Sequence, residues 1–94
     1  VDIRDIVRCE AESNYTRFYF QQKKSILVAR VLKEYEEILE SHGFFRIHKT
    51  HLVNLAYIKK YVDGEGGYIV MEDGSSPAVS RRRKKDLLDK LLKK

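Results

Sequence analysis

Apolar and polar residues alternate along the first third of the chain, and this period of two is typical of β-strands. It predicts strands over residues 6–11, 15–21 and 25–29. Polar residues at 12–14 and 22–24 separate these strands and predict turns. The chain is therefore expected to begin as a group of short, hairpin-connected strands.

The same alternation indicates which strand residues are buried. In the first strand, Val7, Cys9 and Ala11 are expected on one face. In the second strand, Phe18 and Phe20 are expected in the core. Cys9 is the only cysteine and cannot form an internal disulfide, so we expect a small buried residue in a reducing compartment.

From Val31 the apolar period changes to that of an amphipathic helix, and Gly43 occupies a position common after a helix C-terminus. The apolar stripe consists of Val31, Leu32, Tyr35, Ile38 and Leu39. The outer face of this helix is acidic, so we expect it to lie away from any surface that binds a polyanion.

Residues 44–55 begin with alternating apolar and polar positions, which predict a strand with one face toward the core and one toward water. The polar positions are rich in hydrogen-bond donors: Arg46, His48, Lys49, Thr50 and His51. Asn54 follows in an apolar context, so its amide is expected to be buried and bonded to nearby backbone groups. For His48 we consider a structural hydrogen bond and a direct contact with a partner.

Strands are predicted again over residues 57–62, 68–72 and 78–80, with a glycine-rich turn at 63–67. Ser80 is an N-cap candidate for a second helix that runs to the end of the chain. Its apolar stripe is formed by Leu87, Leu88, Leu91 and Leu92.

This second helix begins with five consecutive cations, at residues 81–85. The helix dipole disfavours each of them there by about 0.3–1 kcal/mol. A bound polyanion would offset this cost, so the cluster predicts phosphate contacts, with a merely solvated cluster as the alternative. The charge distribution agrees: the net charge is +5, but residues 81–94 carry +6 and residues 1–80 carry −1.

Other functional classes find little support in the sequence. No apolar run has the length of a membrane span, and no signal peptide is recognisable at the beginning. His42, His48 and His51 lack the spacing and the additional ligands of a metal site. No nucleophile motif, glycine-rich phosphate loop or carboxylate pair stands out, so we expect neither an enzyme nor a cofactor.

Three places are favoured for contact with a partner: Arg81, Lys49 and the segment 13–17. The arginine fork matches the guanine edge, and lysine reaches the same acceptors or a phosphate. Further phosphate contacts are expected from the side chains of Asn14, Tyr15, Arg82 and Arg83.

The string FFRIHKTHLVNL at residues 44–55 resembles the central motif of the LytTR family, the β-rich DNA-binding domain of bacterial response-regulator transcription factors. Other motifs agree in order and spacing. They are DIV at 5–7, EAESNYT at 10–16, LKEYEEIL at 32–39, DG at 73–74 and VSR at 79–81. The resemblance covers nearly the whole chain, residues 1–94, as one domain.

This resemblance implies a mainly β fold of small antiparallel sheets, with one amphipathic helix in mid-chain and one basic helix at the C-terminus. It implies sequence-specific binding of double-stranded DNA, at repeats upstream of promoters, by the cytoplasmic output domain of a two-component response regulator. An N-terminal receiver domain, a homodimer on DNA and no association with membranes are further expectations. The family's first strand or strands, and the receiver domain, are expected to be missing from this chain.

Carried over by position, the resemblance implies base contacts by Thr16, Lys49 and Arg81. It implies phosphate contacts by Arg17, Arg46, Thr50 and Lys84. Two alternatives remain: a protein-interaction module whose basic helix binds an acidic partner, and an RNA-binding domain.

Overall fold

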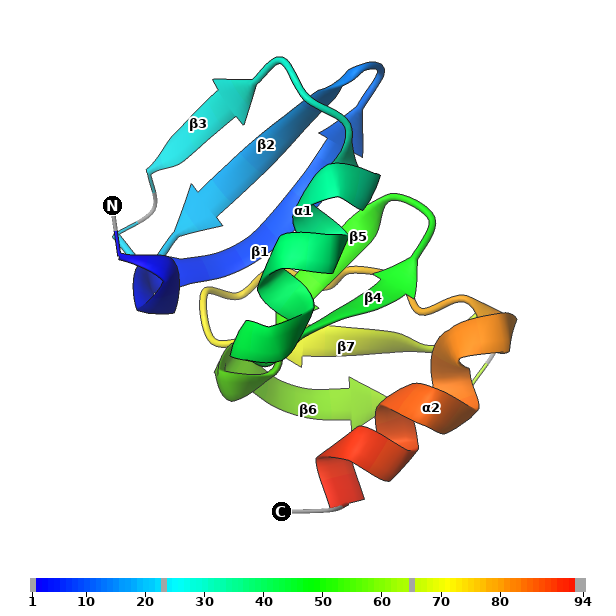
Figure 1. Cartoon of the computed structure of the whole chain (residues 1–94). Coiled ribbons are helices and arrows are strands. Elements are labelled where there is room, and N and C mark those ends of the chain that lie inside the picture. Colours follow the sequence, from blue (N-terminus) through cyan, green and yellow to red (C-terminus); the bar gives the residue numbers. More distant parts are fainter. Residues whose placement is uncertain (1, 23, 65, 93–94) are drawn as a thin grey trace.

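The computed structural model of the protein describes residues 2–22, 24–64 and 66–92 (Figure 1). In chain order, with η for a short 3-10 helix, the elements are η1 (Ile3–Asp5), β1 (Ile6–Glu12), β2 (Tyr15–Phe20), β3 (Ser25–Val28), α1 (Leu32–Leu39), η2 (Glu40–His42), β4 (Phe44–His48), β5 (His51–Asn54), η3 (Leu55–Tyr57), β6 (Ile58–Val62), β7 (Tyr68–Met71) and α2 (Arg81–Leu92). The predicted turns at 22–24 and 63–67, and the end of the predicted last helix, include residues outside the described ones: Lys23, Glu65 and residues 93–94.

The strands form two antiparallel sheets, which confirms the predicted mainly β fold. Five strands pair in the order β3-β2-β1-β5-β4, and β6 pairs with β7. The turn between β1 and β2 is short, because Glu12 already pairs with Tyr15. Ser13 accommodates this turn with a positive φ of 56°.

The predicted strand at 78–80 is reduced to a single bridge between Ala78 and Tyr68. This segment still runs along β7, since the N–H of Ile69 donates to the carbonyl of Pro77 at 3.1 Å and the N–H of Val79 donates to Gly67 at 2.9 Å. Pro77 has no N–H to donate, which limits how far the pairing continues.

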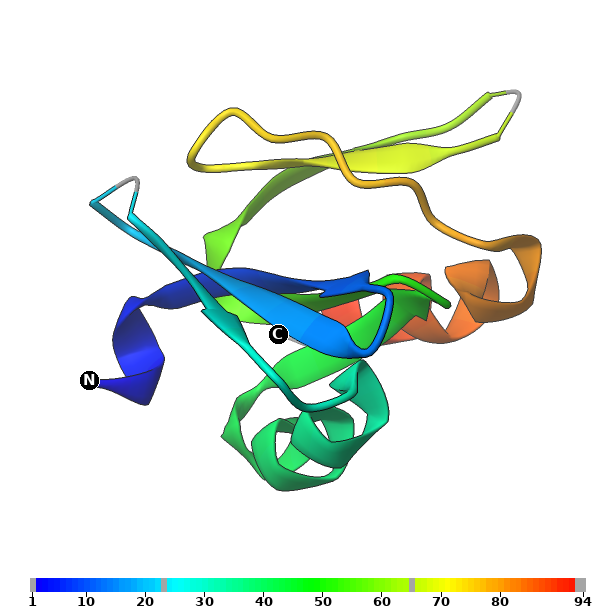
Figure 2. The same ribbon diagram turned by 90° about the horizontal axis from the view of Figure 1, so that it is seen from above.

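The central sheet lies between α1 on one face and the β6–β7 hairpin on the other, and α2 lies beside β4 and adds Leu87 to the core on the hairpin side (Figures 1 and 2). One core, on the α1 side, contains Ile6, Cys9, Phe18, Leu32, Leu39, Phe44 and Leu52. The other contains Val7, Phe45, Ile47, Val53, Ile69, Met71, Val79 and Leu87. A short chain thus buries both faces of its main sheet.

The predicted face of β1 is wrong for one residue. Val7 belongs to the core beneath the hairpin, whereas Cys9 belongs to the core beneath α1 and Ala11 packs at the margin of that same core. A register shift in the pairing with β2 lies between Ile6 and Arg8. Such a bulge places two successive side chains on one face, so the simple alternation of the sequence is interrupted there.

The predicted water-facing side of β4 is also wrong, because α1 covers it. Phe44 packs toward α1 and Phe45 packs toward the other core. The side chain of Arg46 is only 16% exposed and forms an ion pair with Glu36 of α1. Both faces of this strand are therefore engaged in packing.

The helices bury only part of their predicted stripes. In α1, Leu32 and Leu39 are buried and Tyr35 meets Phe18 edge to face at 4.7 Å, but Ile38 is 58% exposed. In α2, Leu87 is fully buried while Leu92, near the helix end, is 82% exposed. Among the described residues, no helix is long and apolar enough to span a membrane.

Candidate nucleic-acid interface

Three segments far apart in the sequence lie along one edge of the molecule: the β1–β2 turn, the β4–β5 turn and the start of α2 (Figure 1, right). Backbone hydrogen bonds join them. The N–H of Ser80 donates to the carbonyl of Ile47 at 2.8 Å, and the N–H of Ala11 donates to Thr50 at 2.9 Å. We call residues 13–15, 49–50 and 81–84 the cationic edge.

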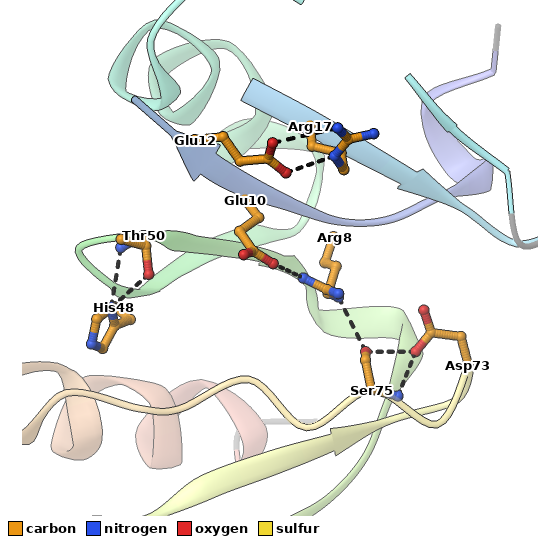
Figure 3. A network of polar contacts seen from close by, with 8 residues as sticks. All are labelled: Arg8, Glu10, Glu12, Arg17, His48, Thr50, Asp73 and Ser75. Carbon is orange, nitrogen blue, oxygen red and sulfur yellow. Dashed lines mark hydrogen bonds and ion pairs between the residues drawn. The ribbon is translucent and has the colours of Figure 1, made fainter. Parts of the chain in front are cut away.

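The β4–β5 turn is built by its own side chains. Arg46 donates through Nε to the carbonyl of His48 at 3.0 Å and through a terminal nitrogen to the carbonyl of Lys49. The N–H of Thr50 donates to Nδ1 of His48 at 3.1 Å, and the two side chains also meet at 3.0 Å (Figure 3). His48 therefore makes the structural hydrogen bond, one of the two roles considered for it: its Nδ1 accepts from the backbone of its own turn.

Lys49 is the residue that this turn presents to solvent. Its side chain is exposed and takes part in no hydrogen bond or ion pair of the described residues. The predicted phosphate contact Thr50 lies beside it, but its hydroxyl is engaged with His48. Lys49 is thus the free cation of the turn.

The start of α2 supplies most of the charge on the cationic edge. The carbonyl of Ser80 accepts from the N–H groups of Arg83 and Lys84, both at 3.1 Å, so the helix begins directly after it. Arg81 and Arg82 are exposed, and within the described part of the chain they form no ion pair. The predicted cluster of cations at a helix N-terminus is therefore present and accessible.

Lys84 is the exception in this cluster, because its Nζ lies 2.9 Å from Oδ1 of Asp63. This hydrogen bond lowers the pKa of Asp63 and raises the pKa of Lys84. The pair is solvent-exposed, so its net stabilisation is small. An arriving anion would have to compete with Asp63 for this lysine.

Thr16 conflicts with the prediction that it contacts a base. Its side chain is fully buried, and its hydroxyl donates to the carbonyl of Arg30 at 2.7 Å. Its neighbours at the β1–β2 turn, Asn14 and Tyr15, are exposed. In this segment the accessible groups are therefore those two and not Thr16.

Arg17 is held by Glu12, its neighbour across the β1–β2 hairpin (Figure 3). Its Nε donates to the carboxylate at 2.6 Å, and a terminal nitrogen donates to Ser25 at 3.1 Å. The hydrogen bond with Glu12 raises the pKa of Arg17. Because this charge is already compensated, Arg17 is a weaker phosphate ligand than its exposed neighbours on α2.

A further arginine, Arg8, connects the central sheet to the loop after β7 (Figure 3). It donates to Glu10 at 2.7 Å and to the hydroxyl of Ser75 at 3.1 Å, and it stacks on the Tyr19 ring. Ser75 in turn donates to Asp73 at 2.6 Å. This partly buried cation supports the fold and does not belong to the cationic edge.

The histidines do not assemble a metal site. Among the described residues no group of three or more His, Cys, Asp or Glu side chains is placed to hold a metal ion. His51 lies 5.5 Å from His48, ring centre to ring centre, and burial lowers its pKa. Its Nδ1 is buried without a hydrogen-bond partner among the described groups.

Sequence reasoning missed the acidic residues that form ion pairs with several of the cations predicted to contact phosphate. Glu12 was within reach of it, because a short turn at 13–14 places Glu12 near Arg17 on the opposite strand. Glu36 and Asp63 carried no such signal, since they pair with residues 10 and 21 positions away.

Comparisons with known proteins identify transcriptional regulators among the relatives of this chain. The chain is 31% identical to the heme-containing CO-sensing transcriptional regulator RcoM 2 of Paraburkholderia xenovorans over 94 residues, which cover 97% of the chain and 35% of that protein. It is 30% identical to the CO-responsive transcriptional regulator RcoM of Rhodospirillum rubrum over 80 residues, or 84% of the chain and 34% of that protein. The chain thus spans about a third of the length of these curated relatives.

A solved structure has the same fold. It is the LytTr DNA-binding domain of a putative methyl-accepting/DNA response regulator from Bacillus cereus, with a TM-score of 0.82 and 24% identity, covering 100% of this chain and 86% of that one. The model of the LytTr DNA-binding domain family matches residues 1–92, which include all three segments of the cationic edge. Because the family model matches all of the described residues, the chain belongs to the LytTR family of DNA-binding domains.

Proposed function

We propose that the cationic edge binds double-stranded DNA in a sequence-specific manner, with Lys49 and Arg81 contacting bases. The observation that carries this proposal is their attachment: the turn with Lys49 and the helix with Arg81 are joined by the backbone bond from Ser80 to Ile47 at 2.8 Å. Two exposed cations on a rigid spacing can meet base edges of one duplex together.

Phosphate contacts are proposed for the exposed groups around these two residues: Asn14, Tyr15, Arg82 and Arg83. Arg82 is exposed, and Arg83 is partly exposed on the same helical turn. Their charges at the helix start, together with the helix dipole, favour an anion there. Arg17, Thr50 and Lys84 are weaker candidates, because each is engaged within the protein.

The test is a titration of labelled duplex at several salt concentrations. The probe is a duplex selected from a random pool by the protein, compared with a scrambled duplex of the same composition. Each phosphate contact should add about −0.9 to the slope of log K against log salt. Affinity that is independent of salt, or equal for the two duplexes, would contradict the proposal.

Substitutions separate base contacts from phosphate contacts. Lys49→Ala and Arg81→Ala should weaken the selected duplex by about 1–3 kcal/mol and the scrambled duplex less. Arg82→Ala should weaken both equally and reduce the slope by about 0.9. Lys59→Ala is the control, because this exposed lysine is on β6, whose start lies at the opposite end of the molecule (Figure 1).

We further propose that the chain is the non-catalytic output domain of a cytoplasmic bacterial transcription factor. A two-component response regulator with a receiver domain, acting as a homodimer on promoter-upstream repeats, fits this role. Sedimentation on duplexes with one and two selected sites measures the stoichiometry. Phosphorylation of the full-length protein should then change its affinity for the two-site duplex, and an unchanged affinity would contradict control by a receiver domain.

A further inference from the structure

Each of the three guanidinium nitrogens of Arg46 is engaged within the protein. It donates to the carbonyls of His48 and Lys49, and its remaining terminal nitrogen lies 2.7 Å from Oε1 of Glu36 on α1. The side chain of Arg46 is 16% exposed, and that of Glu36 is 27% exposed. An enclosed guanidinium that a carboxylate already neutralises is poorly placed to bind a phosphate, which was its predicted role.

The two carbonyls that Arg46 binds lie on either side of the Lys49 Cα. One belongs to the peptide unit before it and the other to the peptide unit after it, so their positions fix both backbone dihedrals of Lys49. The next residue is fixed as well, because the N–H of Thr50 donates to His48 and its carbonyl accepts from Ala11 at 2.9 Å. Rotation of either peptide unit would break one of these bonds, so the direction of the Lys49 side chain at its Cβ is set by this network.

We propose that Arg46 is a positioning residue: held by Glu36, it sets the direction in which Lys49 leaves the β4–β5 turn and thereby its selectivity among bases. This inference rests on the proposed function. It also makes α1, a helix on the face of the sheet and outside the cationic edge, part of base selection. Glu36 is then an acid that improves the recognition of a polyanion.

This role and a phosphate contact predict opposite effects of Glu36→Gln. If Glu36 orients Arg46, its loss loosens the turn and lowers the preference for the selected duplex over the scrambled one. If Glu36 only restrains an arginine that binds phosphate, its loss frees that arginine, raises affinity for both duplexes equally and makes the salt slope steeper. The ratio of the two affinities therefore separates the cases.

Arg46→Lys makes the complementary test. Lysine keeps the charge for a phosphate, but its compact ammonium cannot reproduce the fork that reaches the two carbonyls and the carboxylate together. The positioning role predicts that both variants lose about fivefold to a hundredfold in selectivity, the range of one base contact. A phosphate contact predicts nearly full selectivity for Arg46→Lys.

The matched controls are Arg30→Lys and Glu34→Gln. These residues form an exposed ion pair at 3.4 Å, with Glu34 on the same helix as Glu36, and they contact no carbonyl of the β4–β5 turn. Their selectivity should stay within about twofold of that of the wild type, as is usual for an exposed pair of little energetic weight.

A second measurement does not use DNA. In amide NMR spectra of the free protein, Glu36→Gln and Arg46→Lys should shift the signals of Lys49 and Thr50, whereas the two control variants should not. If Arg46→Lys fails to fold, Glu36→Gln carries the test alone. Unchanged selectivity and unchanged turn signals in Glu36→Gln would overturn the positioning role and leave DNA binding intact. A wild-type protein that prefers no duplex would overturn the proposed function and with it this role.

Discussion

Leu87 is the side chain that anchors α2, and with it Arg81 and Arg82, to the rest of the molecule. It is fully buried in the core formed with β4, β5 and β7. Leu87→Ala removes buried methyl and methylene groups and leaves a cavity, which costs about 2–5 kcal/mol. Leu92 lies on the same helix but is 82% exposed, so Leu92→Ala should change stability by less than about 0.5 kcal/mol.

The effect on the melting temperature follows from the chain length. With 94 residues, the entropy of unfolding is about 0.2 kcal/mol per degree, so a loss of about 3 kcal/mol lowers the midpoint by about 15 °C. Urea unfolding followed by circular dichroism gives the free energy, and a thermal scan gives the midpoint. Leu92→Ala serves as the matched control in both.

The same pair of variants tests the link between packing and binding. Leu87→Ala should weaken the selected duplex at a temperature where the strands remain folded, because a loosened α2 no longer holds Arg81 beside the β4–β5 turn. Equal stabilities of the two variants would show that α2 is not packed through Leu87. Equal stabilities with unequal binding would show instead that Leu87 acts without anchoring the helix.

Three further predictions concern buried polar groups. Asn54→Asp should lower the free energy of unfolding in urea by about 1–3 kcal/mol or more at neutral pH. The reason is that the amide donates to the Ile6 carbonyl at 3.0 Å and an aspartate cannot. The loss should shrink at low pH, where a protonated carboxyl regains a donor. Burial lowers the pKa of His51 below 6.5, so the unfolded chain takes up its proton first and stability should fall as pH drops below about 6.5. In thermal scans, the melting temperature of His51→Leu should fall less steeply with decreasing pH than that of the wild type. Identical pH profiles of the two proteins would contradict this. Burial raises the pKa of Cys9 to about 12, so an aromatic disulfide reagent should label it only through unfolding. Labelling of the native protein should then be at least about a thousandfold slower than labelling in denaturant. Prompt labelling of the native protein would contradict the burial of Cys9.

The elements were predictable from sequence because each carries its own periodicity. Strand alternation and the two apolar helical stripes depend on local residue patterns, and the structure confirms both kinds of element. The assignment of faces was less predictable. Val7 lies on the opposite face from the predicted one because of a bulge that no residue type indicates. Arg46 is covered by α1 and not exposed as predicted, and this is a tertiary contact.

The candidate site shows the same division. The segments that the motifs point to lie along one edge of the structure, and the exposed Lys49 and Arg81 are among its residues. The buried position of Thr16 had a signal in the sequence, because alternation places it on the same face of the strand as the buried Phe18. The pairing of Arg46 with Glu36 had no signal in the sequence, because it depends on how α1 crosses β4.

The attachment of α2 to the β4–β5 turn is made by main-chain atoms, from the N–H of Ser80 to the carbonyl of Ile47. Its geometry therefore does not depend on which side chains occupy positions 49 and 81. If the proposed base contacts hold, exchanging those two side chains would change the base preference while the distance between the contacted base pairs stays constant. Target sites could then diverge in composition without diverging in length.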